Sequence, residues 1–151
     1  MRIIIKKSKV SDSNEIRLLE TKIWGEEVTN KYDMPMIIRF GYVFVACDGK
    51  KIIGSISSYR TNKNEVYVCD IVVDEEYRGN RIGERLYNRL LNEVYGTNVV
   101  SFLDPDRTAT LELHKKLGAK VIKKMNNVYS LDGEDSNLEQ GKRLFVRIEN
   151  K

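Results

Sequence analysis

Histidine and cysteine are scarce in this chain, and their scarcity limits the metal sites and disulfides that it can form. The 151 residues include one histidine, His114, and two cysteines, Cys47 and Cys69. The cysteines stand far apart and form no Cys-x-x-Cys pair, so the sequence offers no standard set of zinc ligands and we expect no metal. Two isolated cysteines are typical of reduced thiols, and we therefore predict a cytoplasmic protein.

Long hydrophobic runs are missing as well. The N-terminal "MRIIIKK" holds only three consecutive isoleucines, too few for the core of a signal peptide. No segment approaches the length of a membrane span, so we predict no membrane partner. The sequence also shows no repeat, no low-complexity tract and no linker, and it has only two prolines. We therefore expect residues 1–151 to form a single domain.

The charge is mildly basic and evenly spread. The formal net charge is +4, with lysines and arginines distributed among 22 acidic residues. A nucleic-acid-binding protein usually gathers its positive charge on one face. The even distribution instead predicts an ordinary charged surface with a basic pocket, and no nucleic-acid partner.

The hydrophobic periodicity predicts a mixed α/β fold, an antiparallel meander followed by a β-α-β crossover. One helix has Ser11 or Asp12 as its cap, and a second, shorter helix breaks near Pro35. A further strand could begin at Val128–Leu131. The predicted strands are 2–8, a hairpin over 41–60, 65–73, 98–103, 119–124 and 142–149; the predicted helices are 11–24, part of 25–40, 82–95 and 104–118.

The stretch "DEEYRGNRIGERL", residues 74–86, joins a strand to a helix and carries the strongest functional signal. The first N–H groups of a helix lack partners and carry the positive end of the helix dipole. Gly79 and Gly83 allow close approach of a ligand, and Arg78 and Arg81 add charged donors. The segment predicts a phosphate or pyrophosphate site, and a simple glycine-containing turn is the alternative. Residues 74–86 contain neither the P-loop motif GxxxxGK[ST] nor the Rossmann motif GxGxxG.

Two motifs resemble those of the GNAT acyltransferase superfamily. "VDEEYRGNRIGERLYNRLL" resembles the family's acyl-CoA-binding segment, Arg/Gln-x-x-Gly-x-Gly/Ala, and "DRTATLELHKKLGAK" resembles its Asn-x-x-Ala-x-x-x-Tyr-x-x-x-Gly-Phe helix. The resemblance implies a mostly antiparallel sheet flanked by helices, with a splay between the fourth and fifth strands, and acetyl-CoA as acyl donor. It also assigns cofactor-binding residues: Ile71 and Val73 for the pantetheine arm; Arg78, Gly79, Asn80, Arg81, Ile82, Gly83 and Glu84 for the pyrophosphate; and Arg107.

This sequence departs from the family pattern at four positions. Arg81 replaces the middle glycine, and we expect it in the first helical turn with a negative φ. Its side chain would reach a CoA phosphate or point to water. Arg107 replaces the usual asparagine, and Ala119 replaces the aromatic residue after Gly118. His114 replaces the family's tyrosine, the residue that protonates the leaving thiolate; an imidazolium can donate to sulfur, and a half-buried helix residue is the alternative.

Acyl transfer to an amine also needs a proton acceptor and an oxyanion donor. Asp70 lies on the strand that would line the site and is our candidate base, with a structural acceptor as the alternative. Glu65 and Tyr67 follow on the alternate register. The N–H of Ile71 is the candidate oxyanion donor. Cys69 is more consistent with a small apolar filler than with an acyl-enzyme nucleophile.

The sequence thus predicts an N-acetyltransferase that acts by direct attack of a primary amine in a ternary complex, on a small molecule or a protein. A non-catalytic CoA-binding module of the same fold is the alternative. The identity of the acceptor is left open. Acceptor recognition is expected from residues 24–40 and 126–141, whose acidic side chains would attract a cationic amine; ordinary solvated loops are the alternative. The acidic residues are Glu26, Glu27, Asp33, Asp132, Glu134 and Asp135. By analogy with the family, residues 142–149 could form a homodimer contact.

Overall fold

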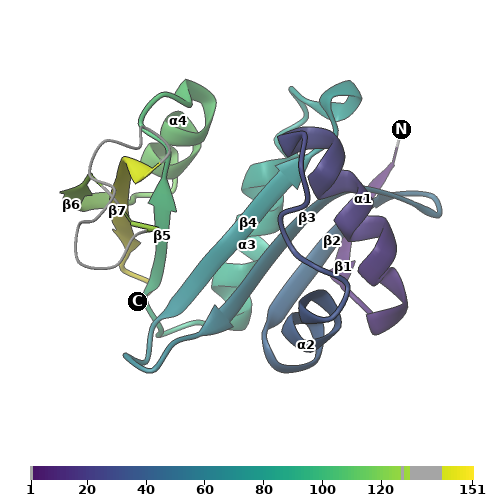
Figure 1. Cartoon of the computed structure of the whole chain (residues 1–151), viewed down its shortest axis with the longest axis horizontal. Coiled ribbons are helices and arrows are strands. Elements are labelled where there is room, and N and C mark those ends of the chain that lie inside the picture. The colour runs from purple at the N-terminus through teal and green to yellow at the C-terminus, as the bar shows by residue number, and fades with distance from the viewer. Residues whose placement is uncertain (1, 127, 130–140) are drawn as a thin grey trace. The chain divides into compact units, whose positions relative to one another are not determined.

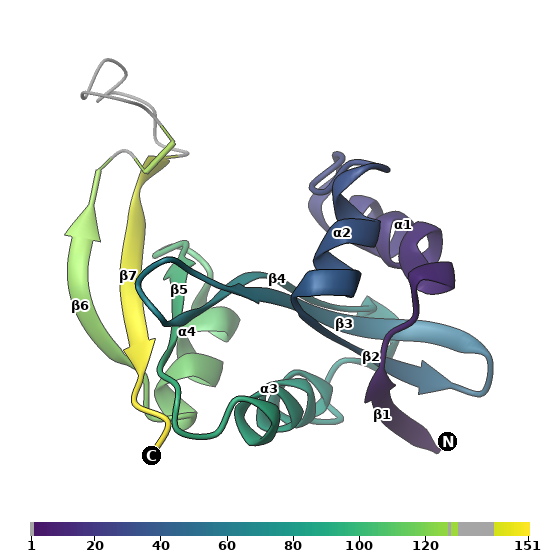
Figure 2. The same cartoon turned by 90° about the horizontal axis from the view of Figure 1, so that it is seen from below.

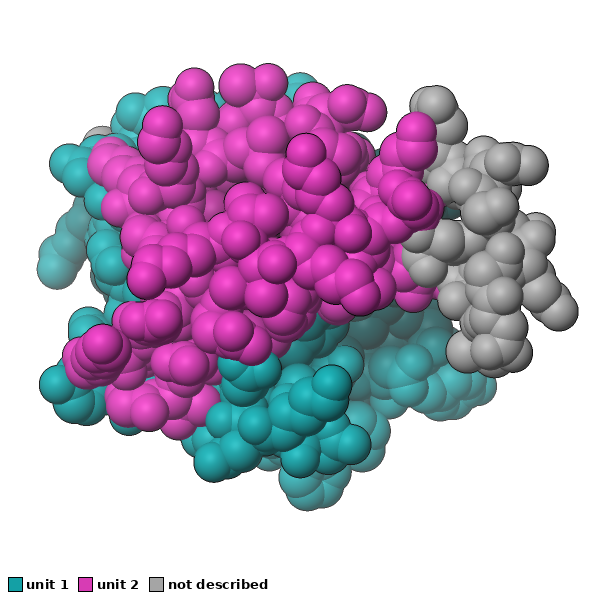
Figure 3. Space-filling model, turned by 90° about the vertical axis from the view of Figure 1, so that its left-hand side faces the viewer, with its two compact units in different colours: residues 1–95 teal, residues 96–151 magenta. Residues whose placement is uncertain are grey.

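The chain divides into two compact units, residues 1–95 and residues 96–151. The computed structural model describes residues 2–126, 128–129 and 141–151. Figure 1 traces the elements along the chain, and Figure 3 distinguishes the two units by colour.

The first unit is built on an antiparallel meander in the order β1-β2-β3-β4. Between β2 and β3, Gly49 has a φ of 60°, a left-handed conformation that glycine adopts at little cost. The predicted hairpin and its turn are therefore confirmed. The strands are β1 (Ile3–Lys7), β2 (Tyr42–Asp48), β3 (Lys51–Arg60) and β4 (Val66–Val73).

Helices cover both faces of this meander (Figure 2). On one face, Val43, Val45 and Val72 of the sheet form a core with buried residues of the first two helices. On the other face, the guanidinium of Arg89 lies 4.6 Å from the ring centre of Phe44. The helices are α1 (Ser13–Trp24) and α2 (Asp33–Phe40) on the first face and α3 (Ile82–Glu93) on the second, with short 3₁₀ turns η1 (Val10–Asp12) and η2 (Glu75–Tyr77).

In the second unit, the last strand lies in the middle. β7 (Arg143–Ile148) pairs antiparallel with both β5 (Val99–Leu103) and β6 (Lys120–Met125). Since β5 and β6 are both antiparallel to β7, they run parallel to each other, with α4 (Thr108–Lys116) between them in sequence. The predicted β-α-β crossover is confirmed, and β7 fills the space between its strands.

One predicted helix boundary was wrong, and the other was confirmed. Pro35 does not break α2, because it lies in the first turn, where its missing N–H has no helical partner to lose. Asp12, one of the two predicted caps, is the N-cap residue of α1, although its carboxylate accepts the N–H of Lys9 at 2.8 Å and no N–H of the helix. Ser11 lies inside η1.

Some predictions fall on parts that the structure does not describe. The strand at Val128–Leu131 lies partly outside the described residues, and Asp132, Glu134 and Asp135 lie wholly outside them. The single domain and the splay between the fourth and fifth strands stay predictions.

Candidate functional site

The predicted phosphate loop is an exposed connection between β4 and α3. Arg78, Gly79, Asn80 and Arg81 are all exposed, and Gly79 has a φ of 85°. A methyl group added at Gly79 would meet no atom within 4 Å, so the space beside this backbone is open. No side chain caps α3, and its first helical backbone bond runs from the N–H of Arg85 to the carbonyl of Arg81. The N–H groups of Ile82 and Gly83 precede this first helical bond, an arrangement that suits an anion.

The start of this loop is anchored at two places in the first unit. Asp74 is buried, and its carboxylate accepts the N–H of Glu76 at 3.1 Å and pairs with Lys22 of α1 at 3.1 Å. Tyr77 donates its hydroxyl to Asp48, at the end of β2, at 2.7 Å. Burial would raise the pKa of Asp74, but the Glu76 N–H and the Lys22 ammonium outweigh it, and the pKa lies below its ordinary value. The loop is therefore held by α1 and by the β2–β3 hairpin.

The prediction for the backbone of Arg81 was wrong. Its φ is 58°, in the left-handed region, because Arg81 is the N-cap of α3 and not a residue of its first turn. This conformation explains why the family pattern has glycine at the position. The guanidinium makes a two-pronged ion pair with Glu84, with Nε–Oε2 and Nη2–Oε1 distances of 2.9 Å each. A phosphate would have to compete with that carboxylate for the side chain.

Ile71 and Val73 lie on β4 with the backbone orientation that the resemblance implies. Asp74 donates its N–H to the carbonyl of Ile53 on β3 at 2.8 Å. Because backbone bonding alternates along an antiparallel pair, the residues of β4 that bond to β3 are those in step with Asp74, such as Val72. The N–H and C=O groups of Ile71 and Val73 are therefore directed away from β3. This orientation fits a ligand that binds like an added strand.

Asp70 faces α1 and α2, and a β-bulge sets its surroundings. Ser57 of β3 lies opposite Asp70, but Ser58 lies opposite Val68, so Cys69 is the extra residue of β4. The prediction that Tyr67 lies on the alternate register was wrong for this reason. Tyr67 pairs with Tyr59, two residues after Ser57, and so shares the face of Asp70.

Two residues of α1 that the sequence analysis missed gather at Asp70. Trp24 donates its Nε1–H to Asp70 Oδ1 at 3.0 Å. Glu20, one turn earlier, is only 1% exposed. Burial, together with a hydrogen bond to Asp70 and the negative charge of Asp70, raises the pKa of Glu20 to about 9. The only feature of the sequence that could have pointed to Glu20 is its position as a charged residue on the apolar face of a predicted helix.

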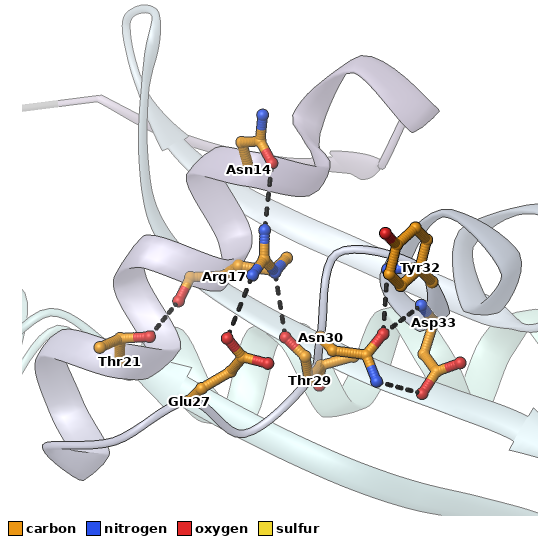
Figure 4. Close-up of polar contacts among 8 residues, drawn as sticks. All are labelled: Asn14, Arg17, Thr21, Glu27, Thr29, Asn30, Tyr32 and Asp33. Atoms are coloured by element: carbon orange, nitrogen blue, oxygen red, sulfur yellow. Dashed lines mark hydrogen bonds and ion pairs between the residues drawn. The ribbon is translucent and has the colours of Figure 1, made fainter.

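The segment predicted to recognise the acceptor is tied to α1 through Arg17 (Figure 4). The Arg17 side chain donates to the carbonyl of Thr29 at 3.0 Å and pairs with Glu27 at 3.4 Å. Asn30 holds the start of α2 by accepting the N–H of Asp33 and donating to its carboxylate, at 2.9 and 2.8 Å. Glu27 and Asp33, both predicted to attract a cationic amine, thus also have structural partners. Large exposed apolar side chains on this segment are Val28, Tyr32, Met36 and Phe40.

The second unit contains the other two predicted site residues. Arg107 is exposed at the start of α4. His114 is 2% exposed, and its Nδ1 lies 2.7 Å from the carbonyl of Thr110, which assigns the proton to Nδ1. Burial lowers the pKa of His114, although the Thr110 carbonyl opposes this shift. A neutral ring at neutral pH weighs against the imidazolium that the acid role needs, and that role stays a prediction.

A comparison with protein-family models identifies the family of this chain. The model of the acetyltransferase (GNAT) family matches residues 14–119, which is more than two thirds of the chain. The chain belongs to the GNAT acetyltransferase family. The matched range contains the exposed loop before α3, the bulged strand β4 and the helix of His114. A comparison with curated proteins gives no significant match.

Solved GNAT structures share the fold at low sequence identity. The ribosomal-protein-S18-alanine N-acetyltransferase of Escherichia coli is 15% identical, covers 99% of this chain and 95% of its own, and has a TM-score of 0.82. Diaminobutyrate acetyltransferase EctA of Paenibacillus lautus, solved with L-2,4-diaminobutyric acid and coenzyme A, is 15% identical, with coverages of 99% and 96% and a TM-score of 0.80. Naa50 of Arabidopsis thaliana, in complex with the bisubstrate analogue CoA-Ac-MVNAL, is 16% identical, with coverages of 97% and 98% and a TM-score of 0.77. The GNAT fold is thereby confirmed.

Two features are absent from the described residues. No helix among them is long and apolar enough to cross a membrane. No group of three or more histidine, cysteine, aspartate or glutamate side chains in the same ranges could hold a metal ion.

Proposed function

We propose that this GNAT protein transfers an acetyl group from acetyl-CoA to a primary amine, by direct attack of the amine on the thioester. The observation that carries the proposal is the exposed, uncapped start of α3 beside β4. There, the first helical N–H groups, at Ile82 and Gly83, and the open backbone at Gly79 suit a diphosphate. Arg78 would add a charged donor, and Arg107 is proposed as a further contact to the cofactor.

The pantetheine arm would bind along β4. The outward backbone groups of Ile71 and Val73 can pair with its amides as a neighbouring strand would. The thioester would then lie near Asp70, with the N–H of Ile71 as donor to the developing oxyanion. Asp70 would accept the proton that the amine must lose before it attacks.

Direct transfer is favoured over an acyl-enzyme by the state of Cys69. Burial raises the pKa of this thiol to about 12, so at neutral pH it is protonated. The thiolate is the nucleophilic form of cysteine. Cys69 is therefore a poor candidate for a covalent intermediate, even though it lies next to Asp70.

The proposal is tested by measuring free thiol released from acetyl-CoA in the presence of a panel of amines: diamines, aminoglycosides, amino acids and peptides with free N-termini. We expect release that depends on both substrates and that falls in Asp70→Asn. Arg39→Ala, an exposed residue at the end of α2, is the control for a lost or altered surface charge. Tight CoA binding without release by any amine would favour the alternative, a non-catalytic CoA-binding module.

A further inference from the structure

A small polar cluster lies inside the otherwise apolar face between α1 and the sheet. Glu20 of α1 is 1% exposed and Ser57 of β3 is 2% exposed. Both carboxyl oxygens of Glu20 and Oγ of Ser57 are buried without a hydrogen-bond partner among the described residues, when Glu20 is taken as ionised. Burying an ionised carboxylate without donors costs several kcal/mol, roughly, in proteins, so the group takes up a proton instead.

The sheet brings a second carboxyl to this cluster. Ser57 lies opposite Val43, a core residue of the α1 face, and on its other side opposite Asp70. Directly opposite residues of antiparallel strands present their side chains to the same face. Asp70 Oδ2 is buried there, and Trp24, four residues after Glu20 on α1, donates to Asp70 Oδ1. Two carboxyls from α1 and β4 thus meet on one side of β4.

The charged and titratable groups around Glu20 are few. From β4 they are Asp70 and Cys69, and from α1 itself Arg17. The Arg17 guanidinium is already bonded to Thr29 and Glu27. Its charge and a hydrogen bond from the Thr29 side chain lower the pKa of Glu20, but burial and Asp70 raise it by more. The thiol of Cys69 keeps its own proton at neutral pH. Two ionised carboxylates side by side would repel each other, and one proton kept within the pair removes this repulsion.

We infer that Glu20 and Asp70 form one proton-sharing pair, in which Glu20 holds the proton and donates it in a hydrogen bond to Asp70, and that this pair is the proton acceptor of the acetyl transfer. Glu20 is a positioning residue, because it acts on the reaction through Asp70. The inference rests on the proposed function. Like-charged carboxyls at close range share a proton because both cannot ionise at once.

In the proposed reaction, every proton and bond has a defined donor and acceptor. The ammonium of the acceptor gives one proton to the Asp70 carboxylate, and the pair becomes neutral. The free amine forms a bond to the thioester carbon and the C–S bond breaks. Of the two protons left on the nitrogen, one goes to the sulfur and the other stays on the amide. The pair then returns its proton to water. The burial of Glu20 supports this assignment, because burial and Asp70 together raise the pKa of that carboxyl to about 9 and keep it a donor at neutral pH.

The first test needs no turnover. The infrared band of a protonated carboxyl is recorded at neutral pH for the wild-type protein and for Glu20→Gln. We expect the wild-type band and its loss in the variant. An absent wild-type band, or a band that Glu20→Gln leaves in place, would overturn the inference whether or not the protein is an enzyme.

The second test measures the acid limb of kcat/KM against pH. Glu20→Leu removes the donor to Asp70, and a carboxylate that loses a hydrogen bond to its charged form has a higher pKa. For Glu20→Leu we expect the acid limb to move to higher pH by about one unit, so that kcat/KM falls about tenfold at pH values below the limb. Glu20→Gln keeps a donor to Asp70, and we expect its limb to move less. Glu15→Gln is the matched control, because that α1 carboxylate accepts the N–H of Ile52 and should leave the limb in place. A limb that Glu20→Leu does not move would refute the shared proton; an inactive wild-type protein would refute the proposed function and leave the infrared result to decide the pairing.

Discussion

At the scale of single residues, Glu20 ties the stability of the fold to pH. Its pKa is about 9 in the folded protein and 4.5 as the ordinary value, so the folded state binds the proton more tightly. The contribution of Glu20 to the free energy of unfolding is fully present below the pKa of the unfolded state. It is lost as the pH rises through the pKa of the folded state. We expect Glu20→Gln to gain stability over the wild type between these values, by up to about 1.4 kcal/mol per pH unit. Urea unfolding at a series of pH values measures the difference, and a difference that does not change with pH would contradict the assignment.

His114 gives the opposite dependence. Burial lowers its pKa, so below the unfolded value near 6.5 the unfolded chain binds the proton more tightly and the fold loses stability as pH falls. Replacing it by the family's residue, His114→Tyr, removes this loss. We expect the variant to gain stability relative to the wild type as pH falls from about 8 to about 5. Denaturant unfolding at both values is the measurement, and an equal difference at the two would contradict a buried neutral ring.

The ion pair between Arg81 and Glu84 leads to a prediction about the affinity for CoA. The carboxylate of Glu84 occupies the guanidinium that would otherwise meet a phosphate. Glu84→Gln frees Arg81 and removes a negative charge from the start of α3, so we expect CoA to bind more tightly, by about threefold at low ionic strength. Calorimetry is the measurement. Glu76→Gln removes an exposed carboxylate of the same loop without freeing Arg81, and an equal gain in that control would attribute the effect to overall charge.

At the scale of elements, the loop before α3 depends on partners distant in sequence. Asp74 is buried, caps η2 and pairs with Lys22 of α1. We expect Asp74→Ala to lower the free energy of unfolding by about 1–2 kcal/mol through the lost cap, and to weaken CoA binding. Asp74→Asn keeps the cap acceptor but loses the ion pair, so it should be milder in both measurements. An Asp74→Ala protein with wild-type CoA affinity would show that the loop does not need this anchor.

The elements themselves could be predicted because local periodicity sets them. The meander, the start of α3 at Ile82 and the end of α4 near Gly118 all follow from patterns within about fifteen residues. The bulge at Cys69 could not be predicted, because it depends on how β3 and β4 pair. The left-handed Arg81 contradicts its residue preference and follows from the turn. Glu20 and Trp24 stand 50 and 46 residues before Asp70, so only the fold could bring them to it.

At the scale of the whole molecule, family membership rests on residues of both units. The family match runs from residue 14 to residue 119, across the division at residues 95 and 96. The first unit contains Asp70 and residues 78–84, and the second contains Arg107 and His114. This distribution does not determine the acceptor, because the names of structurally similar proteins give acceptors as different as an alanine of ribosomal protein S18 and L-2,4-diaminobutyric acid.

A ligand that binds the folded chain should stabilise it as a whole. At a concentration of about 100 times its Kd, CoA would add about 2.7 kcal/mol to the free energy of unfolding. For a chain of this size we expect the Tm to rise by several degrees, by about 2–4 °C for each kcal/mol. A thermal scan with and without CoA measures the shift. An unchanged Tm at saturating CoA would contradict binding to the native state.

The most direct test of the central claim compares CoA with pantetheine, which lacks the diphosphate, by calorimetry at low ionic strength. If the start of α3 binds the diphosphate, CoA binds at least about tenfold more tightly than pantetheine. Gly79→Val, which forces a β-branched residue into a left-handed backbone, should remove most of that difference. Equal affinity for the two ligands, or no heat from CoA, would contradict the account.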